Sequence, residues 1–378
     1  MNKVYRVVWN HAVSRFVVAS EFAKGRVKSA NMSPHKTDKR PGLTLGALSS
    51  AVLLILASGA AWAAGPIFHD GDEARYSDEE VITSAANSAG YGVYALNDGG
   101  KIDFVGGSIT TSGVDAAGAA AANGGVTNID NTRIITTGLG GSGVQANVGG
   151  QVSVKNSTIN TTAKWGRGIV TAGGMVAATD TTIETTGENA YGLDSASGGH
   201  ISFKNGSITT SGKAGIGARV NGVGSSMLIE GSTINVAGGS SPAVFTTLGA
   251  EVSLIDSHVS SKVTHALQAD SDSIINFTGG SITNAGNYAL FARSNGTINV
   301  WDTEINTNSS ALYGTSGTKF NLERVVINTT GSLPVIHGWA YSNMNLKDVQ
   351  INSAGNSRAA MVITLGTDVK VDNVEINA

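Results

Sequence analysis

A short unit that repeats through most of the chain restricts the possible fold more than any other feature. Residues 190–213 are one copy, and their apolar side chains form three short pieces: Leu193, then Ile201 with Phe203, then Ile208. A Gly-Gly pair and an Asn-Gly pair separate these pieces. No piece is long enough to bury a face by itself, so the unit is stable only when it is stacked on further copies.

The repeat has one corner of constant geometry. The repeat occurs in twelve copies between residues 102 and 371. Eleven of them contain a pair of apolar residues two positions apart, and the remaining one, over Val126 to Ile129, is divergent. Five residues after each pair comes a β-branched residue, while the whole repeat ranges from 22 to 26 residues. Changes in length therefore fall in exposed turns elsewhere. The β-branched positions are Ile109, Ile134, Ile159, Ile183, Ile208, Ile234, Val259, Ile282, Ile305, Ile327, Ile351 and Ile376.

The residue two positions after each pair predicts a tight bend. It is Gly, Asn or Asp in every copy except one, where it is Arg324. Gly, Asn and Asp tolerate a left-handed backbone or cap a turn with their own side chain. These positions are Gly106, Asn131, Asn156, Asp180, Asn205, Gly231, Asp256, Gly279, Asp302, Asp348 and Asn373.

A third apolar column precedes each central pair by about eight residues. Ile169 lies seven before its pair, and Ile216 lies eleven before, next to an insertion. Three short strands in about 24 residues, with side chains alternating inward and outward, predict an all-β parallel β-helix over residues 85–378. Strands stack about 4.8 Å apart, so twelve coils would form a rod of about 53 Å. The other residues of this third apolar column are Val144, Leu193, Val244, Leu267, Leu290, Leu312, Ile336 and Met361.

A column of hydroxyls follows the β-branched positions. Thr111, Thr136, Thr161, Thr185 and Thr210 all lie two residues after their β-branched neighbour. We expect each hydroxyl to bond along the stack to its copy above or below, because semi-buried polar groups need partners.

Composition narrows the classes of protein. The chain has 378 residues, no cysteine, 50 glycines and only 5 prolines, which favours many tight turns over disorder and excludes a disulfide scaffold. Residues 1–63 hold nine of the 25 Lys and Arg side chains but only two of the 28 Asp and Glu. The remainder is acidic, which argues against nucleic acid as a partner.

Residues 1–63 are interpreted as a targeting segment. An apolar run over residues 43–61 follows Lys36, Lys39 and Arg40, and Ala61 and Ala63 occupy the −3 and −1 positions of a cleavage site before Ala64. The alternative is a membrane anchor, since the run is near the length of about 20 residues that a span needs.

The first 29 residues resemble the extended signal peptide region of type V secretion in Gram-negative bacteria. The matching features are Met1-Asn2-Lys3, Tyr5-Arg6, Val8-Trp9-Asn10, the run from Phe16 to Glu21, and Lys24, Arg26 and Lys28. The resemblance implies that the inner-membrane export machinery is a partner and that the chain crosses, or is delivered onto, the outer membrane.

Residues 64–84 are expected to be a non-repetitive N-terminal lead-in that caps the first coil, because they carry a charged run with Asp70, Asp72 and Glu73. With its extended signal and Gly-rich repeats, the chain resembles the N-terminal part of a pertactin-like autotransporter. The resemblance implies a right-handed parallel β-helix passenger and a C-terminal β-barrel in the outer membrane. This sequence ends without the barrel, so we expect a truncated or split product, periplasmic unless a barrel is supplied.

No catalytic, cofactor-binding or metal-binding residue can be assigned from the sequence. The β-helix enzymes that act on polyuronides need paired carboxylates, whereas Asp103 is aligned with Asn128, Ser153 and Ala177. The five histidines after residue 63 occupy different repeat positions, and we expect no metal site. They are His69, His200, His258, His265 and His337.

Four aromatic residues fall at turns or outward positions, where they would contact a protein or a carbohydrate, or simply lie scattered on the surface. They are Trp165, Trp301, Trp339 and Tyr341. The sequence therefore favours an exported, non-enzymatic passenger, a surface adhesin or antigen linked to virulence, that binds a host-surface protein or glycan. The alternative is a carbohydrate-active β-helix enzyme, a polyuronide lyase or hydrolase.

Overall fold

The computed structural model describes residues 5–10, 15–20, 64–354 and 360–377. It divides into two units, split between residues 51 and 52. In the first unit, β1 (Tyr5–Asn10) pairs with β2 (Arg15–Ser20) as an antiparallel hairpin. The apolar run over residues 43–61 and the expected −3 and −1 positions of the cleavage site lie outside the described residues.

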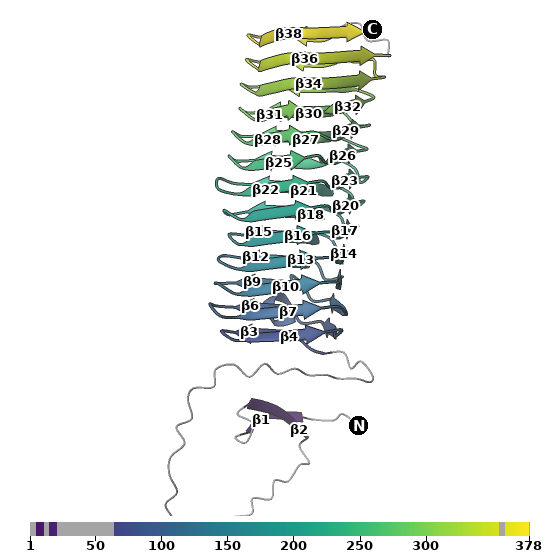
Figure 1. The fold of residues 1–378 in the computed structure, drawn as a ribbon. Helices are drawn as coiled ribbons and strands as arrows, with labels where there is room; N and C mark the ends of the chain where they lie inside the picture. The colour runs from purple at the N-terminus through teal and green to yellow at the C-terminus, as the bar shows by residue number, and fades with distance from the viewer. Residues whose placement is uncertain (1–4, 11–14, 21–63, 355–359, 378) are drawn as a thin grey trace, which may run out of the picture. The chain divides into compact units, whose positions relative to one another are not determined.

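The second unit is a parallel β-helix, which confirms the predicted fold (Figure 1). One of its sheets contains 13 strands, one from each coil. These strands are β3 (Ile67–Asp70), β6 (Val93–Leu96), β9 (Ala117–Ala122), β12 (Ser142–Asn147), β15 (Arg167–Ala172), β18 (Tyr191–Ala196), β21 (Ile216–Asn221), β24 (Val244–Thr247), β27 (His265–Asp270), β30 (Tyr288–Arg293), β33 (Ser310–Gly314), β35 (Ile336–Gly338) and β37 (Met361–Ile363). We call it the 13-stranded sheet.

The other sheet, of 23 strands, takes a central and a third strand from each coil. The central strands are β4 (Glu73–Ser77), β7 (Lys101–Val105), β10 (Val126–Asp130), β13 (Gln151–Lys155), β16 (Met175–Thr179), β19 (His200–Lys204), β22 (Ser226–Glu230), β25 (Glu251–Ile255), β28 (Ile274–Thr278) and β31 (Thr297–Trp301). The third strands are β5 (Glu80–Thr83), β8 (Ser108–Thr111), β11 (Arg133–Thr136), β14 (Thr158–Thr161), β17 (Thr182–Thr185), β20 (Ser207–Thr210), β23 (Thr233–Val236), β26 (His258–Ser261), β29 (Ser281–Asn284) and β32 (Glu304–Thr307).

In the last three coils the central and third strands are continuous. They form β34 (Lys319–Thr329), β36 (Asn343–Ser353) and β38 (Asp368–Asn377). Among the described residues the helical structure is limited to one 3₁₀ turn, η1 (Asn87–Gly90), in the second coil. No helix in this part of the chain combines the length and apolar character that a membrane crossing requires.

The interior of the rod consists of columns of apolar side chains in strict register. Phe203 lies between Ala178 and Ile229 on the neighbouring coils and is fully buried. Ile208 pairs with Ile183 below and Ile234 above in the same way. The predicted inward and outward alternation is therefore confirmed.

The predicted bend is also confirmed. Each residue at this corner has a positive φ, from 46° at Asp256 to 73° at Gly106. Arg324, the one residue outside the Gly, Asn and Asp pattern, adopts φ 54° and so takes the same left-handed conformation. The corner is fixed by stacking even where the side chain does not favour it.

The segment expected to be a lead-in over residues 64–84 is itself the first coil. β3, β4 and β5 pair in parallel with β6, β7 and β8, and Asp78 repeats the left-handed corner. Its inward positions are partly polar, since Tyr76 is aligned with Phe104 and His69 with Ala95. His69 Nε2 lies 2.8 Å from the Tyr76 hydroxyl. With twelve steps between coils, the rod is about 58 Å long.

Two positions of the columns differ from expectation. Ala218, not Ile216, is aligned with Leu193 and Val244 in the third apolar column. Ile216 is aligned instead with Tyr191, which precedes Leu193 by two residues. The insertion lies after β21 and does not displace this strand. In the divergent copy, Thr127 replaces an apolar residue, and its hydroxyl donates to the Ala120 carbonyl at 2.7 Å.

The expectation for the threonine column is wrong. Thr111, Thr136, Thr161, Thr185 and Thr210 are aligned and buried, yet their hydroxyls have no hydrogen-bond partner among the described residues. Equivalent atoms on successive coils lie about 4.8 Å apart, beyond the reach of about 3 Å for a hydroxyl bond. Where a hydroxyl of this column has a partner, that partner is a backbone group: the Thr329 hydroxyl donates to the Ser309 carbonyl at 3.0 Å, and the Thr307 hydroxyl accepts from the Ser309 N–H at 3.1 Å.

The core register predicts a clear difference between two substitutions on neighbouring strands. Phe203→Ala should lower the free energy of unfolding by about 3–5 kcal/mol, because it removes a fully buried ring. Thr209→Ala, at an outward position of β20, should change it by no more than about 0.5 kcal/mol. Denaturant unfolding of the two variants measures this, and equal effects would mean that the register is wrong.

Candidate binding face

The outward surface of the 13-stranded sheet carries a row of rings in contact, stacked from His265 to Tyr313 and edge-to-face from Tyr313 to Trp339. The ring centroids of His265 and Phe291 lie 4.5 Å apart, those of Tyr288 and Tyr313 lie 4.6 Å apart, and those of Tyr313 and His337 lie 4.9 Å apart. Trp339 continues the row, with its ring centroid 6.1 Å from that of His337. We call His265, Tyr288, Phe291, Tyr313, His337 and Trp339 the aromatic strip.

The fold places these rings by register. Phe291, Tyr313 and His337 are aligned on β30, β33 and β35, while His265 is aligned with Tyr288. The spacing of coils, about 4.8 Å, suits offset stacking of rings. Sequence reasoning missed the strip, although a signal existed: Phe291, Tyr313 and His337 each directly follow a member of the third apolar column.

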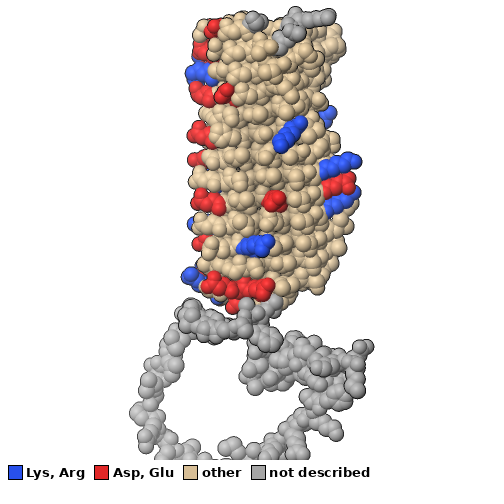
Figure 2. All heavy atoms as spheres, turned by 90° about the vertical axis from the view of Figure 1, so that its right-hand side faces the viewer, with Lys and Arg blue, Asp and Glu red and all other residues tan. Residues whose placement is uncertain are grey.

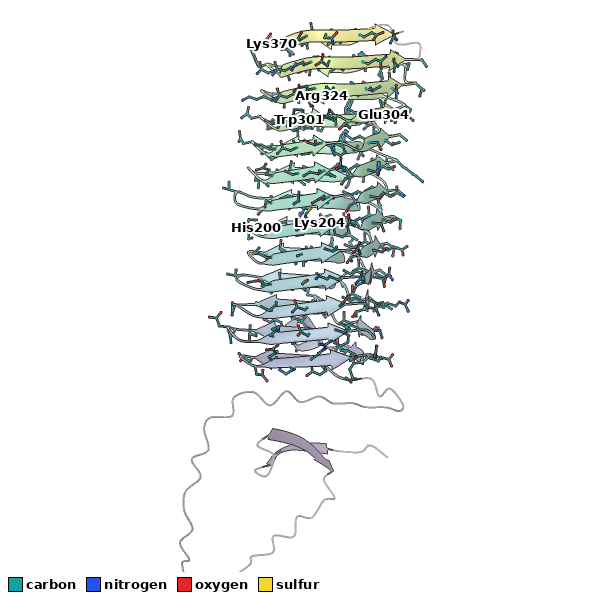
Figure 3. All side chains as sticks on the ribbon, viewed as in Figure 1. His200, Lys204, Trp301, Glu304, Arg324 and Lys370 are labelled. Carbon is teal, nitrogen blue, oxygen red and sulfur yellow. The ribbon has the colours of Figure 1, made fainter. Side chains whose placement is uncertain are left out.

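The four aromatic residues noted in the sequence lie at three different places on the rod. Trp339 and Tyr341 lie together on one coil, with exposed fractions of 42% and 72%. Trp165 is also exposed but lies far along the rod, where the Lys164 ammonium is 4.9 Å from its ring centroid. Trp301 points outward from β31 on the other sheet (Figure 3).

The turn after the strip has a left-handed backbone, as do the equivalent turns at Ser271 and Asp272 and at Ser294 and Asn295 on earlier coils. Ala340 and Tyr341 both have positive φ, 49° and 62°, and on the next coil Leu365 has φ 48°. Bulky side chains rarely adopt this conformation, and here those of Tyr341 and Leu365 are largely exposed.

Burial shifts the pKa of two residues of the strip, His265 and Tyr288. It lowers the pKa of His265 to about 4, with the nearby Arg293 guanidinium acting in the same direction. Burial raises the pKa of Tyr288, and the neighbouring Tyr313 adds to the effect. His265 is therefore neutral at physiological pH, which suits its stacking on apolar rings.

Two sets of ion-paired side chains lie on the same 13-stranded sheet. The nearly buried Asp194 carboxylate accepts hydrogen bonds from Arg167 Nε at 2.9 Å and Arg219 Nε at 2.8 Å, and the Arg219 guanidinium lies 4.6 Å from the ring centroid of Tyr191. Next to the strip, Asp270 is paired with Arg293, whose Nη2 is 2.7 Å from Oδ2. These pairs neutralise carboxylates that burial would otherwise make unfavourable.

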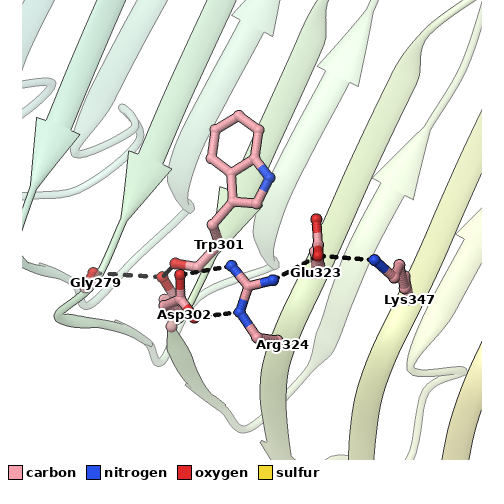
Figure 4. Close-up of polar contacts among 7 residues, drawn as sticks. Gly279, Trp301, Asp302, Glu323, Arg324 and Lys347 are labelled. Atoms are coloured by element: carbon pink, nitrogen blue, oxygen red, sulfur yellow. Dashed lines mark hydrogen bonds and ion pairs between the residues drawn. The ribbon is translucent and has the colours of Figure 1, made fainter.

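At the fixed corner a chain of ion pairs surrounds Arg324 (Figure 4). Its guanidinium binds Asp302 at 2.6 Å and also Glu323, which accepts a bond from Lys347 at 3.0 Å. The bond from Arg324 lowers the pKa of Asp302, and the bond from Lys347 lowers that of Glu323. Asn373 bonds the corner residue Asp348 of the preceding coil in a similar way, at 2.7 Å.

The histidines are dispersed. His200 and His258 each place Nδ1 2.8 Å from a serine hydroxyl on the next coil, that of Ser226 and Ser281 respectively. In residues 64–354 and 360–377, no three side chains of His, Asp or Glu come together as metal ligands would. Asp103 accepts a bond from Asn128 at 2.7 Å, so its aligned neighbour is an amide, as the sequence indicated.

Comparison with known families identifies the N-terminal segment. Residues 1–61 match the family model described as the extended signal peptide of the type V secretion system. The interpretation of this segment from its sequence is thereby confirmed. The match ends before the rod begins, and no curated protein matches this chain.

Solved structures resemble the rod. The chain is similar to Vag8, an autotransporter passenger, in the structure of its complex with C1 inhibitor, with TM-score 0.50, 15% identity, and coverage of 82% of this chain and 100% of that chain. At this identity the likeness concerns the fold. Together, signal and rod support export from a Gram-negative bacterium of a β-helix like that of an autotransporter passenger.

More distant similarities cover functionally different proteins. The A-module of mannuronan C-5 epimerase AlgE4 from Azotobacter vinelandii has TM-score 0.42 and 11% identity, covering 81% of this chain and 88% of that chain. PfbA, a surface adhesin of Streptococcus pneumoniae, has TM-score 0.30 and 7% identity, covering 82% and 85%. Similarities this weak do not distinguish an enzyme from an adhesin.

The lowered pKa of His265 makes stability depend on pH. Since this pKa is about 4 in the folded state and about 6.5 when unfolded, the unfolded chain binds the proton more readily. The contribution of neutral His265 is complete above pH 6.5 and is lost as the pH falls toward 4. Going from pH 7 to 4.5 should cost about 2 kcal/mol in the wild type.

Replacing the imidazole by a ring that cannot titrate tests this effect. In His265→Phe the part of the pH dependence due to this residue should disappear, while the control His200→Gln, at an exposed position, should keep it. Thermal unfolding at the two pH values measures the difference. An unchanged pH dependence in His265→Phe would contradict the assignment.

Proposed function

We propose that this exported chain, with its type V signal and passenger-like β-helix, is a non-enzymatic surface adhesin that binds host-surface molecules through the side of a rigid rod. The observation that carries the proposal is the aromatic strip, which ends at the exposed Trp339 and is followed by the exposed Tyr341. Trp and Tyr supply a large share of the binding energy at interfaces. Rings already stacked on one another lose little conformational entropy when a partner binds.

The surroundings of the strip suit a contact surface. Ile363 and Leu365, on the next coil, are also exposed, at 47% and 60%. Monomeric proteins rarely expose contiguous apolar patches unless they bind something. The Asp270–Arg293 pair at the margin offers polar groups, as the rims of interfaces do. Under this proposal the protein acts at the cell surface or after release, as an antigen and contributor to virulence.

The alternative is a carbohydrate-active enzyme on the same scaffold. It requires two carboxylates on either side of a bound sugar chain. Incubation of the purified protein with polyuronides measures this directly. Clear turnover would replace the adhesin proposal with the enzymatic one.

Binding to cultured epithelial cells tests the adhesin proposal. The double variant Trp339→Ala with Tyr341→Ala should reduce the apparent affinity at least about tenfold, as expected for truncation of interface hot spots. The matched control Trp165→Ala removes an equally exposed indole from a distant coil and should change the affinity by less than about twofold. Equal losses in both, or no saturable binding by the wild type, would contradict the proposal.

A further inference from the structure

A second surface with a defined shape lies on the other sheet. A groove of about 900 Å³ follows the ends of the third strands from β29 to β38. Its lining includes a row of amides, one per coil, at Asn306, Asn328, Asn352 and Asn377. These residues are aligned on β32, β34, β36 and β38.

The amides form a ladder that leaves donors and acceptors for a ligand. Asn352 Nδ2 donates to Asn328 Oδ1 at 2.9 Å, and Asn377 Nδ2 donates to Asn352 Oδ1 at 3.1 Å. Asn328 Nδ2 donates to both Asn306 and Glu304 at 2.9 Å. Each amide nitrogen has two hydrogens, so Asn352 and Asn377 each retain one, and the amide of Asn306 retains both.

The lower end of the groove contains a buried amide without partners. Asn284 lines the groove and is only 1% exposed, yet neither its Nδ2 nor its Oδ1 has a hydrogen-bond partner among the described residues. Buried side-chain amides are nearly always bonded, because unmade bonds are unfavourable. Asn284 is aligned with Ser261 and Thr307 in the inward column whose hydroxyls from Thr111 to Thr210 also lack partners, so its side chain belongs to the core beneath the groove.

The lining also restricts the chemistry of that ligand. No Lys, Arg, Asp or Glu is among the described residues that line the groove. Figure 2 faces the third strands and shows a mostly uncharged surface, with a row of charged side chains along its left margin and a few single charges within it. An acidic chain such as a polyuronide would find no cation here, and a basic peptide would find no carboxylate.

A peptide strand fits less well than a sugar chain. β29, β32, β34 and β36 are each paired on both sides, so their backbone groups are already bonded. β38 is paired only with β36, and a strand added to its free edge would run across the rod and not along the groove. Addition of a β-strand, the usual way to bind an extended peptide, needs a free edge. Side-chain amides in a row, which donate and accept in equal measure, match a row of hydroxyls.

We propose that this groove binds a neutral oligosaccharide along the rod. The ladder from Asn306 to Asn377 would bond hydroxyls of successive sugars. The site belongs to a different sheet from the aromatic strip. It therefore adds a ligand class to the adhesin proposal without depending on it, and each site can fail alone.

Calorimetric titration of the purified protein tests the proposal. The probes are neutral hexasaccharides of β-1,4-glucose, α-1,4-glucose and α-1,6-mannose, with hexagalacturonate as the acidic comparison and an uncharged Ser-Ala-Thr decapeptide as the peptide comparison. At least one neutral hexasaccharide should bind measurably, and more tightly than both comparisons. Binding of none of the three, or tighter binding of the uronate or the peptide, would overturn the proposal.

The chain contains a matched control for the ladder. Asn276, Asn299, Asn321 and Asn345 form a similar row on the central strands, with bonds of 2.8, 2.7 and 2.6 Å, outside the groove. Asn328→Thr with Asn352→Thr should weaken binding of the hexasaccharide at least about tenfold. Asn299→Thr with Asn321→Thr should change it less than about twofold. Equal effects of the two double variants would contradict the assignment of the groove.

Two further variants keep the test valid if the ladder variants lose stability. Ala354→Trp fills the groove from an exposed position, so it should abolish binding while the melting temperature is kept. Asn284→Thr copies Thr307 on the next coil at an inward position beneath the groove, and it should change the affinity by less than about twofold. Retained affinity in Ala354→Trp would overturn the proposal. The variant with Trp339 and Tyr341 truncated should bind the hexasaccharide normally, which separates this site from the strip.

Discussion

The left-handed corner after each central strand is the constraint on which the rest of the rod depends. It lies two residues after the inward pair and three before the β-branched residue in every coil, from Asp78 to Asn373. Since that distance is constant, each coil repeats the path of the one below it, and the columns of inward side chains stay aligned. Phe203 meets Ala178 and Ile229 because the corners at Asp180, Asn205 and Gly231 coincide. Variation in length is confined to the other turns.

The same constraint explains how much the sequence could predict. The offset of five residues was visible as a repeated spacing, and it led to the strands, the core columns and the corner. The sequence could not predict the environment of residues that lie outside the regular spacing of the repeat or that differ in type from their aligned neighbours. Ile216 looked like a core residue until the strand was aligned through Ala218. The threonine column looked capable of bonding along the stack, but it is too widely spaced. The first coil was overlooked because Tyr76 and His69 occupy positions that are apolar in other coils.

The candidate sites were least visible in the sequence because they depend on contacts between coils. His265, Tyr288 and Tyr313 are ordinary residues in a linear sequence, separated by more than twenty positions, and they become a stack only through the register of β27, β30 and β33. The amide ladder arises in the same way from Asn306, Asn328 and Asn352. A β-helix converts one residue per coil into a continuous row, so its sides can carry extended binding surfaces while the core remains uniform. Here the two rows lie on different sheets and offer different chemistry: stacked rings on one, amides on the other.

The stacking of coils in constant register is the central claim, and one distance measures it directly. Thr110 and Thr283 occupy the same outward position seven coils apart, connected through the aligned pairs of the third strands. The chain has no cysteine, so spin labels on cysteines introduced at these two positions report on a single pair. Electron–electron resonance should give one narrow distribution near 34 Å, seven times the spacing of about 4.8 Å between strands. A second labelled pair, Thr110 with Thr209, is four coils apart and should give about 19 Å. A broad distribution for either pair, or two distances that are not in the ratio of seven to four, would contradict the stacked register.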